Sequence, residues 1–225
     1  MLNAKTVMVV APHADDETLG AGGALCRLKQ GGAELHWTLM TTPEGAGYPA
    51  DYVAAHAAQV DAVAAAYPFD GLHRLDYPAS TLAAQPVGAL VDRLRALAAA
   101  VRPDVILLPH RGDAHDDHGA TAAAAQAAFK GFRMPSFGVR ALYAMEILSE
   151  TDAVMGPPAH PFIANTFVDI SDHLDRKVEL FGLYRTEVTE GGPRSPEAVR
   201  AQALLHGAAV GRPAAERFMR LQAVL

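Results

Sequence analysis

The sequence contains a single cysteine, no long apolar run and no basic segment. Because Cys26 has no second thiol to pair with, an internal disulfide and a zinc site built from several thiolates are excluded. Acidic residues outnumber basic ones, 25 to 19, which argues against general binding to nucleic acid or anionic membranes. No run approaches the roughly 18 apolar residues of a membrane-spanning helix, and the N-terminus leads directly into a strand-like segment instead of a signal peptide. We therefore expect a cytoplasmic protein without a membrane span.

The chain does contain a regular alternation of short apolar runs and longer helical stretches. Half of its 225 residues are hydrophobic, so it can bury a sizeable core, and no repeat or linker divides it. The patterns predict strands over 6–11, 35–41, 72–75, 105–108, 141–148 and 166–170, and helices over 22–30, 51–67, 87–101, 119–130, 171–184 and 196–205. This alternation predicts one domain over 1–225, a three-layer Rossmann-like α/β fold with a mostly parallel central sheet.

Polar side chains of one chemical kind follow the first and the fourth predicted strand. His13, Asp15 and Asp16 come after the first strand, and His115 and His118 come after the fourth. Because ligands bind at the carboxyl ends of parallel strands, the two clusters are expected to meet. Imidazole and carboxylate groups suit zinc and similar divalent ions, and a catalytic site needs three protein ligands and one open position.

Each cluster also has a purely structural explanation. Asp15 and Asp16 could cap the helix that follows them, and one His-x-x-His spacing is unsurprising among ten histidines. The presence of both clusters after the two most apolar strands favours a metal site. In such a site one of the adjacent carboxylates can bind the metal while the other takes a proton from metal-bound water.

Both motifs resemble those of the PIG-L/LmbE-like zinc deacetylases. The segment that begins A-P-H-A-D-D-E at Ala11 is similar to the family's Ala-His-Pro-Asp-Asp-Glu signature, with Ala14 in place of proline. The H-D-D-H segment that begins at His115 is similar to the family's His-Pro-Asp-His, with Asp116 in the proline position. Further similarity is found at Phe167–Ser171, Lys177 and Ala215–Phe218.

The resemblance implies a hydrolase that removes an acyl group, usually acetyl, from the 2-amino group of a small glucosamine-type sugar or conjugate. It implies that the ligands of a Zn²⁺ ion are His13, Asp16 and His118. It also implies Asp15 as the general base and His115 as the group that polarises or protonates the developing oxyanion, with Asp117 tuning the charge of His115. The metal would lower the pKa of its bound water from 15.7 to about 7.

Other polar residues are candidates for contacts with substrate or ligand. Glu146 lies in an apolar predicted strand, where a buried carboxylate needs a partner. Arg185, Arg194 and Ser195 surround a Gly-Gly-Pro break, and clustered arginines suit a phosphate or carboxylate on the substrate. Asp113 could hydrogen-bond a ligand histidine or only turn its loop. Solvated surface arginines are the ordinary case, and exposure at a strand end is the ordinary alternative for Glu146.

Two other enzyme classes and a binding module fit part of the pattern. Two histidines and one carboxylate also form the facial triad of Fe(II) oxygenases, although those triads usually occupy β-barrels. The glycine run from Gly20 to Gly23 could suggest a Rossmann-type methyltransferase or cofactor-binding protein, but it departs from G-x-G-x-x-G, and close packing of a helix against the sheet is the favoured use. A non-catalytic sugar-binding module would not require an open metal position. The oligomeric state is not predicted.

Overall fold

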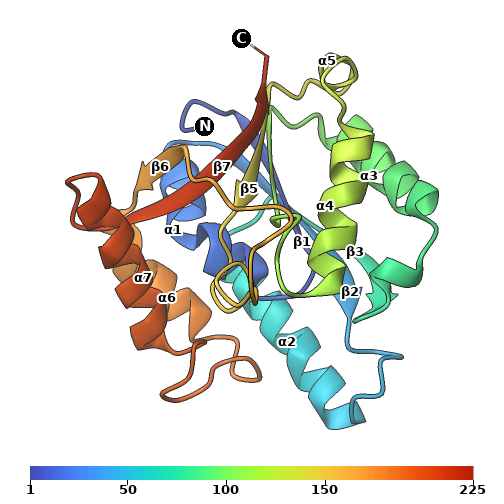
Figure 1. The fold of residues 1–225 in the computed structure, drawn as a ribbon. Helices are drawn as coiled ribbons and strands as arrows, with labels where there is room; N and C mark the ends of the chain where they lie inside the picture. Colours follow the sequence, from blue (N-terminus) through green and yellow to red (C-terminus); the bar gives the residue numbers. More distant parts are fainter. Residues whose placement is uncertain (225) are drawn as a thin grey trace.

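A seven-stranded sheet forms the centre of the computed structural model, which describes residues 1–224 (Figure 1). Its strands are β1 (Thr6–Ala11), β2 (Glu34–Thr42), β3 (Gly71–Pro78), β4 (Val105–Leu108), β5 (Ala141–Met145), β6 (Thr166–Asp169) and β7 (Ala215–Ala223). They lie in the order β3-β2-β1-β4-β5-β7-β6. Strands β1 to β5 pair with one another in parallel, and β7 is antiparallel to both β5 and β6. The predicted mostly parallel sheet is confirmed.

Helices cover both faces of the sheet and complete three layers (Figure 1). They are α1 (Asp16–Gln30), α2 (Ala50–Ala66), α3 (Val87–Val101), α4 (Asp116–Ala128), α5 (Met134–Phe137), α6 (Leu174–Phe181) and α7 (Pro196–Ala209), with short 3₁₀ turns η1 (Leu82–Ala84) and η2 (Ser171–His173). One core contains apolar residues of α1, α2, α6 and α7, and the other contains those of α3, α4 and α5. No helix in residues 1–224 is long and apolar enough to cross a bilayer.

The strand β1 shows why an apolar run becomes a central strand. Val7 and Val9 point into the core beneath α1, while Met8 and Val10 point into the core beneath α3 and α4. Successive side chains of a strand face opposite sides of the sheet, so a strand covered on both sides must be apolar throughout. All four side chains are fully buried.

Several predicted boundaries were wrong, and two of these errors concern the polar clusters. The helix predicted from Gly22 begins at Asp16, and the one predicted from Gly119 begins at Asp116. The acidic residues that obscured these starts form the first helical turns, where the helix dipole favours negative charge. The strand predicted to reach Leu148 ends at Met145, and the strand β7 was not predicted.

The glycines of α1 allow this helix to lie unusually close to the sheet and to η2. A Cβ atom on Gly23 would lie 2.7 Å from Cβ of Ile170, and one on Gly20 would lie 2.8 Å from Cβ of Met145. Real Cβ atoms do not approach other atoms this closely, so a larger residue would push α1 outward. The packing role favoured by the sequence is confirmed.

A buried ion pair is hydrogen-bonded to the middle of α1. The carboxylate of Glu216 accepts hydrogen bonds from the backbone N–H groups of Gly23 and Ala24 at 2.9 and 2.8 Å. The ammonium group of Lys177 donates to the Leu19 carbonyl at 2.8 Å and to Glu216 at 2.7 Å. The Leu19 carbonyl and the Gly23 N–H are i−4 and i partners in a regular helix. Side chains from α6 and β7 therefore fix the helix that carries Asp16.

Candidate metal centre and substrate cleft

The two polar clusters meet at the carboxyl ends of β1 and β4, which are neighbours in the sheet. His13 lies in the loop after β1, Asp16 begins α1, and His118 lies in the first turn of α4. One ligand atom from each of these residues lies within 4.8 Å of the other two. Oδ2 of Asp16 is 3.4 Å from Nδ1 of His13 and 3.2 Å from Nε2 of His118. A second such group contains His13, His115 and Asp117.

Three buried polar atoms at this point have no hydrogen-bond partner within residues 1–224. They are Nε2 of His118, Oδ1 of Asp16 and Oδ1 of Asp15. An unsatisfied buried polar group is costly, and a buried carboxylate requires a cation or several donors. The donor set of two imidazoles and one carboxylate suits zinc and related divalent ions. The residues present therefore fit a bound metal ion.

The pKa values of His13 and His118 also indicate that positive charge stabilises this cluster. Burial lowers the pKa of His13, but hydrogen bonds to Asp117 and Asp16 outweigh burial and raise this pKa to about 9. Burial likewise lowers the pKa of His118, but the charge of Asp16 and the hydrogen bond to Asp113 raise it to about 10. The surrounding carboxylates thus stabilise two imidazolium charges, and a divalent cation could supply the same charge.

Asp113 orients His118. Its Oδ2 lies 2.9 Å from Nδ1 of His118, which leaves Nε2 facing Asp16. The same carboxylate accepts hydrogen bonds from the backbone N–H of His110 and from the hydroxyl of Thr151. A carboxylate on the second nitrogen fixes the tautomer and ring orientation of a metal-binding histidine. Of the two explanations that the sequence left open for Asp113, the structure supports this contact.

Asp15 is held in a strained backbone conformation beside the cluster. Its φ angle is 116°, a region that residues other than glycine rarely occupy and that is often found at functional sites. Its N–H donates to Oε2 of Glu17 at 3.2 Å, and Nη1 of Arg194 lies 3.2 Å from its Oδ2. Burial and the adjacent charge of Asp16 raise the pKa of Asp15 well above its usual range. These contacts leave Oδ1 free to accept a proton.

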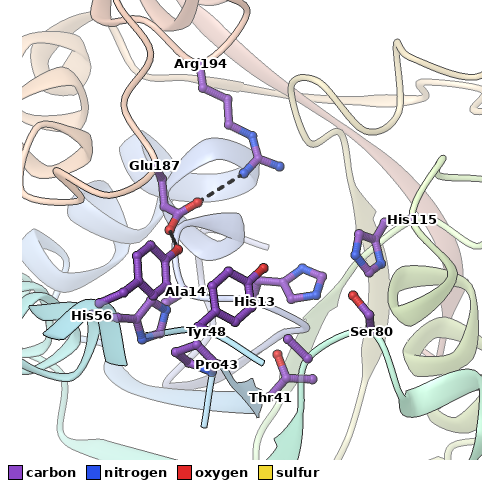
Figure 2. A pocket seen from close by; sticks show the side chains of 12 residues that line it. His13, Ala14, Thr41, Pro43, Tyr48, His56, Ser80, His115, Glu187 and Arg194 are labelled. Carbon is purple, nitrogen blue, oxygen red and sulfur yellow. Dashed lines mark hydrogen bonds and ion pairs between the residues drawn. The ribbon is translucent and has the colours of Figure 1, made fainter. Parts of the chain in front are cut away.

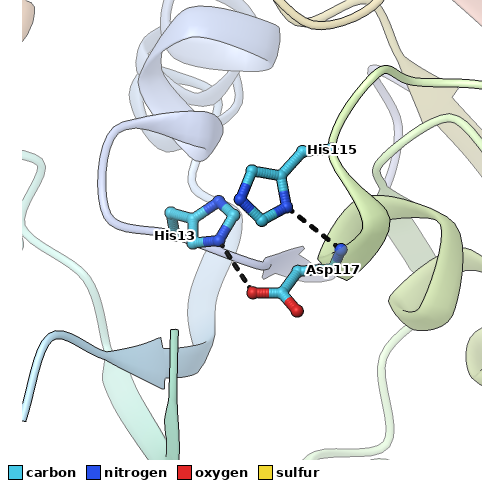
Figure 3. Close-up of side chains that lie close together, drawn as sticks. All are labelled: His13, His115 and Asp117. Carbon is cyan, nitrogen blue, oxygen red and sulfur yellow. Dashed lines mark hydrogen bonds and ion pairs between the residues drawn. The ribbon is translucent and has the colours of Figure 1, made fainter. Parts of the chain in front are cut away.

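His115 and Asp117 lie close together, and the Asp117 carboxylate also contacts the neighbouring His13. The carboxylate of Asp117 lies 3.1 Å from Nε2 of His13 and accepts backbone hydrogen bonds from Ser80 and Leu82. The contact between Asp117 and His115 is a backbone one, in which the N–H of Asp117 donates to Nδ1 of His115 (Figure 3). This contact leaves Nε2 of a neutral His115 as the protonated nitrogen. Burial and the nearby His13 lower the pKa of His115.

An open cavity of about 220 Å³ lies against the cluster (Figure 2). Its lining includes His13, His115, Thr41, Ser80, Tyr48, Tyr52, His56, Glu187 and Arg194. The sequence did not indicate four of these residues, Tyr48, Tyr52, His56 and Glu187. Tyr52 and His56 are four residues apart within α2, a spacing that puts their side chains on one helical face, and Tyr48 lies in the loop just before α2. That spacing was the signal available in the sequence.

Of the four side chains expected to contact substrate, only Arg194 lines this cavity. Glu146 lies just beyond β5, where it pairs with Arg217 and lies 3.2 Å from Nε2 of His206. Arg185 is exposed at the surface. The hydroxyl of Ser195 caps α7 by accepting a hydrogen bond from the Ala198 N–H.

The fold and this site define a class of protein, a Rossmann-like α/β domain with an imidazole–carboxylate cluster at the carboxyl end of its parallel strands. Residues 8–129 match the PIG-L family, described as GlcNAc-PI de-N-acetylase. The chain belongs to this family, and the resemblance inferred from its two motifs is confirmed.

One relative and two solved structures are similar to this chain. A Bacillus cereus protein described as a probable N-acetyl-alpha-D-glucosaminyl L-malate deacetylase 2 is 26% identical over 191 residues, covering 80% of this chain and 83% of the relative. The N,N'-diacetylchitobiose deacetylase of Pyrococcus horikoshii has a TM-score of 0.79 at 19% identity, covering 97% of this chain and 84% of that one. The 4-carboxy-2-hydroxymuconate hydratase GalB of Pseudomonas putida has a TM-score of 0.76 at 19% identity, covering 98% of both chains. The two structural likenesses show the shared fold.

Proposed function

We propose that this protein is a metal-dependent N-deacetylase that hydrolyses the acetamide of an N-acetylglucosamine-type sugar or conjugate. The observation that carries the proposal is the convergence of His13, Asp16 and His118 beside an open cavity, with buried atoms of Asp16 and His118 that make no hydrogen bond. Family membership and the Bacillus cereus relative support the reaction and the sugar substrate.

In this proposal His13, Asp16 and His118 hold a zinc ion. When bound, such an ion acidifies a coordinated water and polarises an amide carbonyl. The imidazole and carboxylate donors also suit related divalent metals, so the choice of zinc rests on the family.

The remaining residues of the cluster move protons and stabilise charge. Asp15 takes a proton from the attacking water at Oδ1, because its Oδ2 is engaged by Arg194. His115 donates from Nε2 to the carbonyl oxygen as negative charge develops there, because its Nδ1 already accepts the Asp117 N–H. As the C–N bond breaks, the leaving nitrogen receives the proton that Asp15 removed from water, and the products are acetic acid and a free amine, which exchange a proton to become acetate and an ammonium. Asp117 orients His13 and, through its N–H, His115.

The alternative enzyme classes have less support. The glycines expected of a cofactor-binding loop are accounted for by close helix packing. The facial triad of an Fe(II) oxygenase usually occurs in a β-barrel, whereas this sheet is open and mostly parallel. Because a protein described as a hydratase shares the fold, the assay must measure acetate itself.

Acetate release from N-acetylglucosamine derivatives, with and without chelator, tests the proposal. We expect activity that chelator abolishes and that added metal restores. The variant Asp15→Asn should keep the bound metal but lose at least 100-fold in kcat, whereas His118→Ala should lose metal. Asp116→Asn is the matched control, because Asp116 lies in the same turn of α4 as His118 but is exposed. Activity that ignores chelator, or full turnover by Asp15→Asn, would overturn the mechanism.

A further inference from the structure

The wall of the cavity opposite His115 has an unusual composition, with stacked aromatic rings and an arginine whose charge is already balanced (Figure 2). The rings of Tyr48 and Tyr52 are stacked, with centroids 4.8 Å apart and an interplanar angle of 16°. His56 continues the stack at 6.3 Å from Tyr52. Tyr48 is nearly half exposed. An aromatic surface of this kind suits the apolar C–H face of an uncharged ring.

Arg194 is the only lysine or arginine side chain that lines this cavity among residues 1–224. Its Nη1 lies 3.2 Å from Oδ2 of Asp15 and 3.6 Å from Oε2 of Glu187. Its Nη2 donates to Oε1 of Glu150 at 2.8 Å, and its Nε donates to the Ser149 hydroxyl at 2.7 Å. Three carboxylates therefore surround one guanidinium group, whose nitrogens are all engaged. Because three carboxylates share its charge, this arginine attracts a phosphate or carboxylate of the substrate less strongly than a free arginine would.

Glu187 adds negative charge to the same wall. Its Oε1 accepts hydrogen bonds from the Tyr52 hydroxyl at 2.8 Å and from Thr186. The aromatic stack and the arginine cluster are thus joined through one carboxylate, and they act as a single surface. An anionic group placed there would meet like charge in a partly desolvated site, which is unfavourable.

We infer that this wall selects an uncharged sugar unit and discriminates against substrates that carry phosphate or carboxylate groups. The inference rests on the proposed deacetylase function and goes beyond it, because it names the substrate class. It also separates this chain from the Bacillus cereus relative, whose described substrate carries the carboxylates of malate. Tyr48 provides the stacking surface, and Glu187 provides the charge that repels anions.

Two pairs of substrates, one neutral and one anionic, test the inference. The rate of acetate release is measured with N,N'-diacetylchitobiose and methyl N-acetylglucosaminide, which are neutral, and with N-acetylglucosaminyl malate and N-acetylglucosamine 1-phosphate, which are anionic. We expect kcat/KM to be at least tenfold higher for the neutral pair. If no substrate releases acetate, the proposed function fails. If acetate is released but the anionic pair reacts as fast or faster, this inference fails and the proposed function stands.

Variants at Glu187 and Tyr48 test which residues cause the preference for neutral substrates. Glu187→Gln keeps an oxygen to accept the Tyr52 hydroxyl but removes the charge, so the preference for neutral substrates should fall at least threefold. Tyr48→Ala should raise KM for the neutral substrates about tenfold with a smaller effect on kcat, and Tyr48→Phe should recover most of that loss. Phe132→Ala removes an aromatic ring that is exposed away from the cavity and serves as the control. An unchanged preference in Glu187→Gln, or an unchanged KM in Tyr48→Ala, would refute the role of that residue.

Discussion

The buried pair of Lys177 and Glu216 provides the most direct test of how the fold supports the site. Both side chains are almost fully buried, and they bond to the backbone of α1 between Leu19 and Ala24. The substitution Lys177→Met keeps a long flexible side chain but removes the ammonium group. It leaves the Glu216 carboxylate buried with two backbone donors and no cation, and it leaves the Leu19 carbonyl without its side-chain donor.

The expected loss is large because an unpaired buried charge costs more than a missing contact. Removing one partner of a buried ion pair destabilises a protein by about 3–5 kcal/mol. The two N–H donors that remain on Glu216 favour the lower end of this range, about 3 kcal/mol. For a chain of this length that loss lowers Tm by about 6–12 °C. In the double variant Lys177→Met/Glu216→Gln the charge is gone, so the loss should be smaller than the sum of the two single losses by about 1–3 kcal/mol.

Urea unfolding followed by circular dichroism measures these differences through the midpoint and the m-value. Lys29→Met is the matched control, because Lys29 and Asp70 form an ion pair of nearly the same length, 2.6 Å, with both side chains partly exposed. An exposed pair contributes about 0–1 kcal/mol, so this variant should unfold almost like the wild type. If both lysine variants lose the same stability, or if the double variant is additive, the reasoning about the buried pair is wrong.

Three further predictions follow from the packing around α1 and from the histidine contacts. Gly23→Ala should lower the free energy of unfolding by about 1–3 kcal/mol, despite the better helix propensity of alanine, because the new Cβ would overlap Ile170; a more stable variant would contradict this. Burial raises the pKa of the Cys26 thiol to about 11, so at pH 8 only about one thiol in a thousand is ionised, and alkylation should be far slower in the native protein than in urea; equal rates would contradict it. Asp113→Ala should weaken metal binding about 10–100-fold in a chelator competition, because His118 loses its orienting carboxylate; an unchanged affinity would contradict that role.

The accuracy of the sequence predictions depended on how local the determining interactions are. The strand at 105–108 and the helix at 87–101 were predicted with their observed bounds, because their apolar residues have a clear period. β7 was missed because charged and polar residues interrupt its pattern, and its place between β5 and β6 depends on pairing with distant strands. The starts of α1 and α4 were missed because their first turns carry the acidic residues of the candidate site.

The metal-binding candidates could be chosen from sequence because their chemistry is carried by residue type, and the strand ends bring them together. The cavity wall could not, because its parts come from segments that only the fold joins. Tyr52 and Glu187 are 135 residues apart, yet they share a hydrogen bond. The four-residue spacing of Tyr52 and His56 indicates a shared helical face, but nothing local indicates that this face meets Glu187.

Arg194 shows most clearly why residue type alone does not determine a role. An arginine next to a glycine-rich break has the composition of an anion-binding site, and in sequence no partner for it is visible. In the fold, Asp15, Glu150 and Glu187 reach its guanidinium group from three separate segments and engage its donors. The same side chain that would attract a phosphate if it were free therefore contacts Asp15, and nearby carboxylates offset its charge. Which substrates such a wall accepts depends on the balance of charge around the arginine, and this balance is set by tertiary contacts.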